Sequence, residues 1–215
     1  MDVFLEAVTK GDRARVRAML AQDPSLADRK SESGVSALLM AVYYQKPEIA
    51  NDLVAAGAQV EIFEAAALGD AKRARELLHQ DPGLANAFAV DGFQPLGLAS
   101  FFRQPELVSL LLDAGAEVNS ASRNSQRVMP VHSSVASHSL DITRALLEHG
   151  AEVNAVQQDG YTPLLEAAQA GELETLELLL QYGADPAARR EDGQTALDLA
   201  RQEGHSDIVA RLTRS

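Results

Sequence analysis

The chain has 215 residues, of which 46% are hydrophobic and 5% aromatic, and its formal net charge at pH 7 is −12. This acidic balance disfavours nucleic acids and anionic membranes as partners, because both need a basic face. The chain has no cysteine, which excludes disulfides, a thiolate nucleophile and thiolate metal ligands. The N-terminus shows no signal peptide and no stretch is apolar enough to span a membrane, so we expect a cytoplasmic protein.

The first half of the chain reads as four short helical modules, over residues 1–32, 33–60, 61–90 and 91–122. Gly11-Asp12 separates two helices in the first module, and Asp23-Pro24 favours a new turn after the second helix. The third module repeats these features and the fourth resembles the second, at an offset of about 58 residues. The link from Gly57 to Val60 is too short for a hairpin, so we expect one projecting loop to be absent there.

The second half continues with modules over residues 123–157, 158–189 and 190–215. The segment between Asn119 and Pro130 is about two residues longer than its equivalents, which predicts a larger projecting loop. The sixth module is the most regular. Asp159-Gly160 predicts a turn, Thr162 can cap a helix that Pro163 begins, and Gly171 separates this helix from a leucine-rich second helix.

The repeated unit has a period of about 33 residues, the length of a β-turn followed by two helices. The sequence DGYTPLLEAAQAGELETLELLLQYGAD, with its counterparts in the other modules, resembles the ankyrin-repeat family over nearly the whole chain. The resemblance implies an all-α solenoid of about seven helix-turn-helix modules with short β-hairpin fingers. Such an array should have a core that is continuous from end to end.

The same resemblance implies that the last two residues of each first helix point into a concave groove that often binds other proteins. Only the second and fourth modules have aromatic pairs there. Together with a leucine from the third module, these pairs would form an apolar strip; its residues are Tyr43, Tyr44, Leu68, Phe101 and Phe102. Large rings on an exposed patch are typical of protein-binding sites.

The alternative is that these rings hold the repeats together. Gln45 and Arg103 replace the glycine between the two helices in the second and fourth modules. Their first helices would then run longer, and one ring of each pair would pack against a neighbouring repeat. A second candidate contact is the basic finger that carries Arg123, Asn124 and Arg127, for which a plain polar loop is the alternative.

Catalytic and metal sites have weaker support. No nucleophile elbow or phosphate-binding glycine motif occurs. The acidic residues of the sixth module suggest a solvated helix face, with paired carboxylates as the alternative; these residues are Glu166, Glu172, Glu174 and Glu177. The chain has five histidines, at 79, 132, 138, 149 and 205. His132 and His138 are six residues apart across a helix end, a poor spacing for two metal ligands on one face, and His149 and His205 occupy turn or helix-end positions where a histidine commonly serves as a cap. The family resemblance implies that His132 hydrogen-bonds backbone and ties adjacent turns.

We therefore expect a non-catalytic scaffold, without cofactor or metal, that binds a protein partner through its groove and fingers. It would be a monomer or a weak homodimer. The alternatives are a self-associating structural module whose aromatic strip forms the contact, and a regulator that binds a peptide or a small molecule.

Overall fold

The computed structural model describes residues 2–214, and its regular elements are helical. In the first three modules the α-helices span Val3–Lys10 (α1), Arg13–Gln22 (α2), Ala37–Tyr43 (α3), Pro47–Ala55 (α4), Ile62–Leu68 (α5) and Ala71–Gln80 (α6). Two short 3-10 helices follow α2 and α6, at Pro24–Asp28 and Pro82–Asn86. The Asp-Pro pairs therefore do begin new turns, and Asp23 and Asp81 cap them through their side chains.

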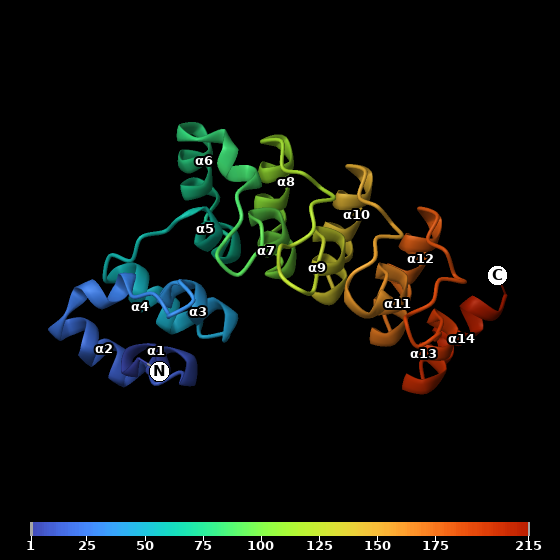
Figure 1. Cartoon of the computed structure of the whole chain (residues 1–215), viewed down its shortest axis with the longest axis horizontal. Helices are drawn as coiled ribbons and strands as arrows, with labels where there is room; N and C mark the ends of the chain where they lie inside the picture. The colour runs from blue at the N-terminus through green and yellow to red at the C-terminus, as the bar shows by residue number, and fades with distance from the viewer. Residues whose placement is uncertain (1, 215) are drawn as a thin grey trace.

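In the other four modules the α-helices span Pro95–Phe101 (α7), Pro105–Asp113 (α8), Pro130–Ala136 (α9), Leu140–Glu148 (α10), Pro163–Ala170 (α11), Leu173–Gln181 (α12), Ala196–Glu203 (α13) and Ser206–Thr213 (α14). The third 3-10 helix, Gln158–Gly160, precedes α11. Successive helix pairs stack side by side, so that α5, α7, α9 and α11 form one row and α6, α8, α10 and α12 another (Figure 1). The predicted all-α solenoid of seven helix pairs is confirmed.

The sixth module shows why these residues form this unit. The Thr162 hydroxyl accepts a hydrogen bond from the Leu165 amide, and Pro163 begins α11. Leu164, Leu165, Ala167 and Ala168 are buried on one face of that helix. Gly171 ends it with φ of 78°, a left-handed conformation that glycine adopts without a steric penalty. The same glycine position leaves room for the ring of His205, whose Nε2 lies 3.0 Å from the Gln169 carbonyl oxygen.

The fingers are tight hairpins with little regular strand structure. Backbone hydrogen bonds close four of them across four residues, from Ser31 to Val35, Ala89 to Phe93, Gln157 to Tyr161 and Arg190 to Gln194. In the fifth module the corresponding bond runs from the Ser122 amide to the Val128 carbonyl, two residues longer. The larger finger is therefore confirmed. Isolated β-bridges join Lys30 to Ser36 and Arg189 to Thr195.

The link between α4 and α5 has no hairpin among its described hydrogen bonds, as expected, and it changes the whole array. The Gln59 amide instead donates to Asp28 of the first module, at 2.7 Å. Figure 1 shows an extended link here, with α1 to α4 set apart from the regular stack of α5 to α14. The expectation of a core continuous from end to end is wrong: the buried apolar residues form two clusters, one within 4–58 and one within 62–212. Val60 packs against both clusters.

The helices before Gln45 and Arg103 are not longer than their counterparts, so this part of the alternative interpretation is wrong. Tyr43 ends α3 and Phe101 ends α7, and two residues later the chain turns through a left-handed conformation, with φ of 54° at Gln45 and 57° at Arg103. His138 has the same role in the fifth module, with φ of 57°. The stacking of neighbouring repeats preserves the turn even where the residue is not glycine.

Candidate functional site

The four rings of the predicted strip divide into an exposed pair and a packed pair. Tyr44 and Phe101 are 54% and 49% exposed, whereas Tyr43 and Phe102 are partly buried against the larger core cluster. The Tyr43 and Phe102 rings stack on each other with centroids 5.9 Å apart, and Phe101 meets Phe102 edge-on at 5.2 Å. Each aromatic pair thus supplies one ring for internal packing and one for the surface.

Tyr43 crosses from the second module to the fourth, over the third. Its hydroxyl donates a hydrogen bond to Asp91, at 2.5 Å, in the finger that precedes α7. Burial, together with this contact to a carboxylate, raises the pKa of the Tyr43 hydroxyl. Two local features permit the crossing. First, residues 65–67 of α5 are all buried alanines, whose small side chains leave space above them. Second, the third module has no finger, so Gly34 in the finger of the second module lies against Val90 in the finger of the fourth.

Leu68, in the third module, is less exposed than Tyr44 and Phe101. It is partly buried against the N-terminal core cluster. With Phe102 and Gln45 it lines a small depression on the surface of the groove. Of the residues predicted to form the strip, Leu68 and Phe102 thus lie together, and Tyr44 and Phe101 are the two with large exposed ring area.

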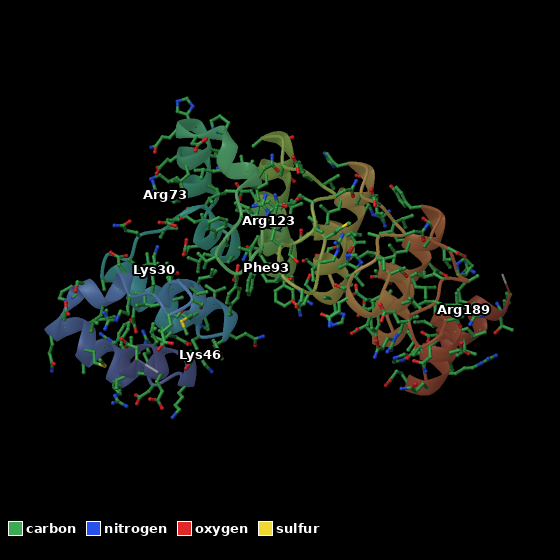
Figure 2. The ribbon with its side chains drawn as sticks, in the orientation of Figure 1. Lys30, Lys46, Arg73, Phe93, Arg123 and Arg189 are labelled. Carbon is green, nitrogen blue, oxygen red and sulfur yellow. The ribbon has the colours of Figure 1, made fainter. Side chains whose placement is uncertain are left out.

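Next to Phe101 the groove deepens into a cavity of about 470 Å³. Tyr43, Phe93 and Phe101 line it with rings, and Val128 and Leu98 add aliphatic surface. Phe93 lies on the side of the array that faces the first two modules (Figure 2). The volume falls within the range of about 300–1,000 Å³ that is usual for ligand sites, and the mixture of apolar walls with few polar groups is also typical of them.

Two ionisable residues besides Tyr43 line this cavity. His132 is buried and its ring is tied to backbone: Nδ1 accepts from the Met129 amide at 3.3 Å, and Nε2 lies 3.2 Å from the Ala155 carbonyl oxygen. Burial lowers the pKa of His132 to about 4, so the ring is neutral at pH 7. The backbone-binding role implied for this residue is confirmed.

Glu166 is the second ionisable residue, and its environment differs from the expected one. Its Oε1 accepts a hydrogen bond from the Gln157 side chain, while Oε2 is buried and has no hydrogen-bond partner within the described chain. Burial raises the pKa of this carboxyl to about 8. The prediction that Glu166 belongs to a solvated acidic face is therefore wrong, whereas Glu174 and Glu177 are exposed as expected.

Helical periodicity offered a signal for Glu166. This residue precedes Gln169 and Ala170, the two expected groove positions of α11, by three and four residues. It must therefore lie on the same face as they do. All three residues line a second hollow of the groove, which also includes Gln157 and Tyr161.

The basic finger is less free than its sequence suggests. The Arg123 guanidinium lies 3.6 Å from the centroid of the Phe88 ring, a cation–π contact that anchors it to the neighbouring finger. Asn124 donates to the Asp91 carbonyl oxygen at 3.1 Å. Arg127 is exposed and has φ of 53°. Both arginines are exposed, but Arg123 lies against the Phe88 ring.

His149 and His138 also have polar contacts. The Nδ1 atom of His149 lies 2.7 Å from the Ala145 carbonyl oxygen, and Nδ1 of His138 lies 3.0 Å from the Glu172 carboxylate. Within residues 2–214, no three His, Asp or Glu side chains come together in a way that would hold a metal ion. In the same range, no helix is both long and apolar enough to cross a bilayer.

Comparison with known proteins agrees with this architecture. A family model described as ankyrin repeats (3 copies) matches residues 62–157 and 150–215. The chain is also similar to a putative ankyrin repeat protein, FPV031, of fowlpox virus (strain NVSL), with 38% identity over 77 residues. That similarity covers 36% of this chain and 22% of the viral protein, so the chain spans well under two thirds of that relative.

Proposed function

The chain belongs to the ankyrin-repeat family, whose repeats are generally protein–protein interaction modules, and on this premise we propose that it is a non-catalytic scaffold that binds a protein partner in its concave groove. Tyr44 and Phe101 make the main contact in this proposal. Leu68 contributes apolar surface beside them, and the finger with Arg123 and Arg127 contacts the partner at the edge.

The observation that carries the proposal is the exposure of Tyr44 and Phe101, at 54% and 49%, on a structure whose other large rings mostly pack inward. Exposed tyrosine and phenylalanine bury large area at small entropic cost, which makes them frequent centres of binding energy. Because Phe101 is held edge-on against Phe102, its ring is already ordered before binding. A preordered surface loses less conformational entropy when the partner binds.

Two double variants test the proposal. Tyr44→Ala with Phe101→Ala removes the exposed pair, and we expect nearly normal stability with binding of the native partner weakened more than tenfold, about 1.4 kcal/mol. Tyr43→Ala with Phe102→Ala removes the packed pair and should lose several kcal/mol of unfolding free energy. Partners would be recovered from the native source on wild-type protein, and their affinities for each variant measured.

Unchanged affinity for the variant that lacks the exposed pair would contradict the proposal. Light scattering on wild-type protein provides the second check. A concentration-dependent homodimer that disappears in the Tyr44→Ala, Phe101→Ala variant would show that the rings join two copies of the chain, and would replace the proposal with self-association.

A further inference from the structure

The cavity beside Phe101 owes its space to a missing side chain. Gly97 lines it and lies inside α7, where glycine is unfavourable relative to alanine. Gly97 is the third residue of α7. The third residue of the first helix in the second, fifth and sixth modules is Leu39, His132 and Leu165, respectively, and all three are buried.

The packing around Gly97 does not require a glycine. A Cβ atom at this position would have Ser133 Oγ as its nearest neighbour, at 3.9 Å, which is ordinary van der Waals contact. The backbone is helical and has no left-handed φ. The residue therefore leaves open a space that three other modules fill, at some cost to the helix.

The chemistry around this space favours a cation. No lysine or arginine is among the described residues that line the cavity, and its histidine is held neutral by burial. Three rings present faces or edges to the cavity, and ring faces attract cations. Glu166 also lines the cavity; its Oε1 accepts from the Gln157 side chain, and its Oε2 is buried without a hydrogen-bond partner in the described chain. The net charge of the whole molecule is −12, which attracts basic segments over longer distances.

We propose that this cavity is the anchoring pocket for an arginine side chain in a basic segment of the partner protein. The alkyl stem of the arginine packs among Tyr43, Phe93 and Phe101, and its guanidinium turns towards Glu166. Arginine suits such a site better than lysine, because its planar head is weakly hydrated and stacks on aromatic rings. An incoming cation also favours the ionised form of the Glu166 carboxyl over the protonated form that burial alone favours. This inference rests on the proposed function and specifies the chemistry of the partner.

The test uses a random library of 12-residue peptides displayed on phage. The library is selected on immobilised wild-type protein and counter-selected against a Gly97→Leu variant, in which the cavity is filled. Leucine occupies the equivalent position in two other modules, so this variant should fold normally. A Ser109→Leu variant, which adds the same side chain on the exposed surface of α8, is the matched control and should bind every selected peptide as wild type does.

The expected result is enrichment of arginine among the peptides that survive counter-selection. A synthetic copy of such a peptide should bind wild type at least tenfold more tightly than Gly97→Leu. Replacing its arginine with citrulline, which has the same shape without the charge, should weaken binding to wild type about tenfold. The Glu166→Gln variant should bind the arginine peptide several-fold more weakly and the citrulline peptide unchanged.

Survivors anchored by apolar or acidic residues, or peptides that bind Gly97→Leu as well as wild type, would overturn the inference. So would equal binding of the arginine and citrulline peptides. Failure of the arginine pocket can be distinguished from failure of the proposed function. If the native partner still binds Gly97→Leu but not Tyr44→Ala with Phe101→Ala, the arginine pocket is wrong and the groove interface stands.

Discussion

Glu166 is a carboxylic acid in a largely apolar groove, and its titration should be visible in the stability of the fold. Its folded pKa, about 8, lies above its ordinary value of 4.5 because burial penalises the charged form. Between these values the folded state binds one more proton than the unfolded state, so stability contributed by this group falls as pH rises. His132 acts in the opposite sense. Its pKa is lowered from 6.5 to about 4, so its contribution is lost as pH falls through that range.

A Glu166→Gln variant isolates the first effect. We expect it to gain stability relative to wild type as pH rises from 5 to 8, by on the order of 1 kcal/mol per pH unit. Urea unfolding at several pH values in this range measures the difference. Glu174→Gln, at an exposed position of α12, is the control and should show no such trend. A Glu166→Gln difference that does not vary with pH would mean that the carboxyl is solvated.

The turns between paired helices illustrate how neighbouring elements override local sequence. Where the turn residue is glycine, a side chain of the next module packs over it, as Gln104 does over Gly69 and donates to the Ala67 carbonyl oxygen at 3.2 Å. At two of the turns without glycine, the side chain of the turn residue contacts the next module, as Arg103 does at the Ser137 carbonyl oxygen and His138 at Glu172. Both arrangements tie successive repeats together and keep a left-handed residue at the turn.

This conformation strains a residue that has a Cβ atom, by about 1–2 kcal/mol. We expect Gln45→Gly to relieve the strain and to raise the unfolding free energy by about 0.5–1 kcal/mol after the added flexibility of the unfolded chain is subtracted. Gln45→Ala keeps the Cβ atom and should give no gain. The urea midpoints of the two variants decide the matter, and equal midpoints would show that the turn is not strained.

Sequence patterns predicted the repeated units, the longer fifth finger and the absent third finger, because each of these follows from the local spacing of turn and apolar residues. They indicated, as an alternative, that one ring of each aromatic pair would pack against a neighbouring repeat, but not that Tyr43 would stack on Phe102. That contact depends on how the second and fourth modules approach over the buried alanines of α5, which is a property of the array. The environment of Glu166 has a related cause: Glu174 and Glu177 of the same module are exposed, whereas Glu166 faces Gln157 and the walls of the groove.

At the scale of the whole molecule, the absent finger divides the core into two clusters that meet near Val60. Repeat arrays are stabilised by each unit and its interfaces, so a weak interface allows one part to unfold before the other. Side chains of the second module join the smaller N-terminal cluster to the rest: Tyr43 contacts Phe102 and Asp91, and Ser36 donates to Glu64.

Two core variants test this division. Leu53→Ala and Leu146→Ala each remove a fully buried leucine, one from each cluster, at a cost of about 2–5 kcal/mol. In hydrogen exchange followed by mass spectrometry, we expect Leu53→Ala to speed exchange in α1 to α4 while α9 to α14 stay protected. Leu146→Ala should mainly affect the C-terminal modules. Equal loss of protection along the chain in both variants would show that the array unfolds as one unit.

The central claim, that the exposed rings of the groove meet a protein partner, has a direct test in cells of the native source. The photoreactive residue p-benzoylphenylalanine replaces Phe101 in one variant and Tyr182 in another. Tyr182 is 40% exposed and follows α12, outside the proposed interface. We predict that illumination joins the first variant to a discrete second protein, that the adduct disappears when Tyr44→Ala is added, and that the Tyr182 variant yields no such product. An adduct of the same mass from both positions, or from Phe101 only a dimer of the chain itself, would contradict the account.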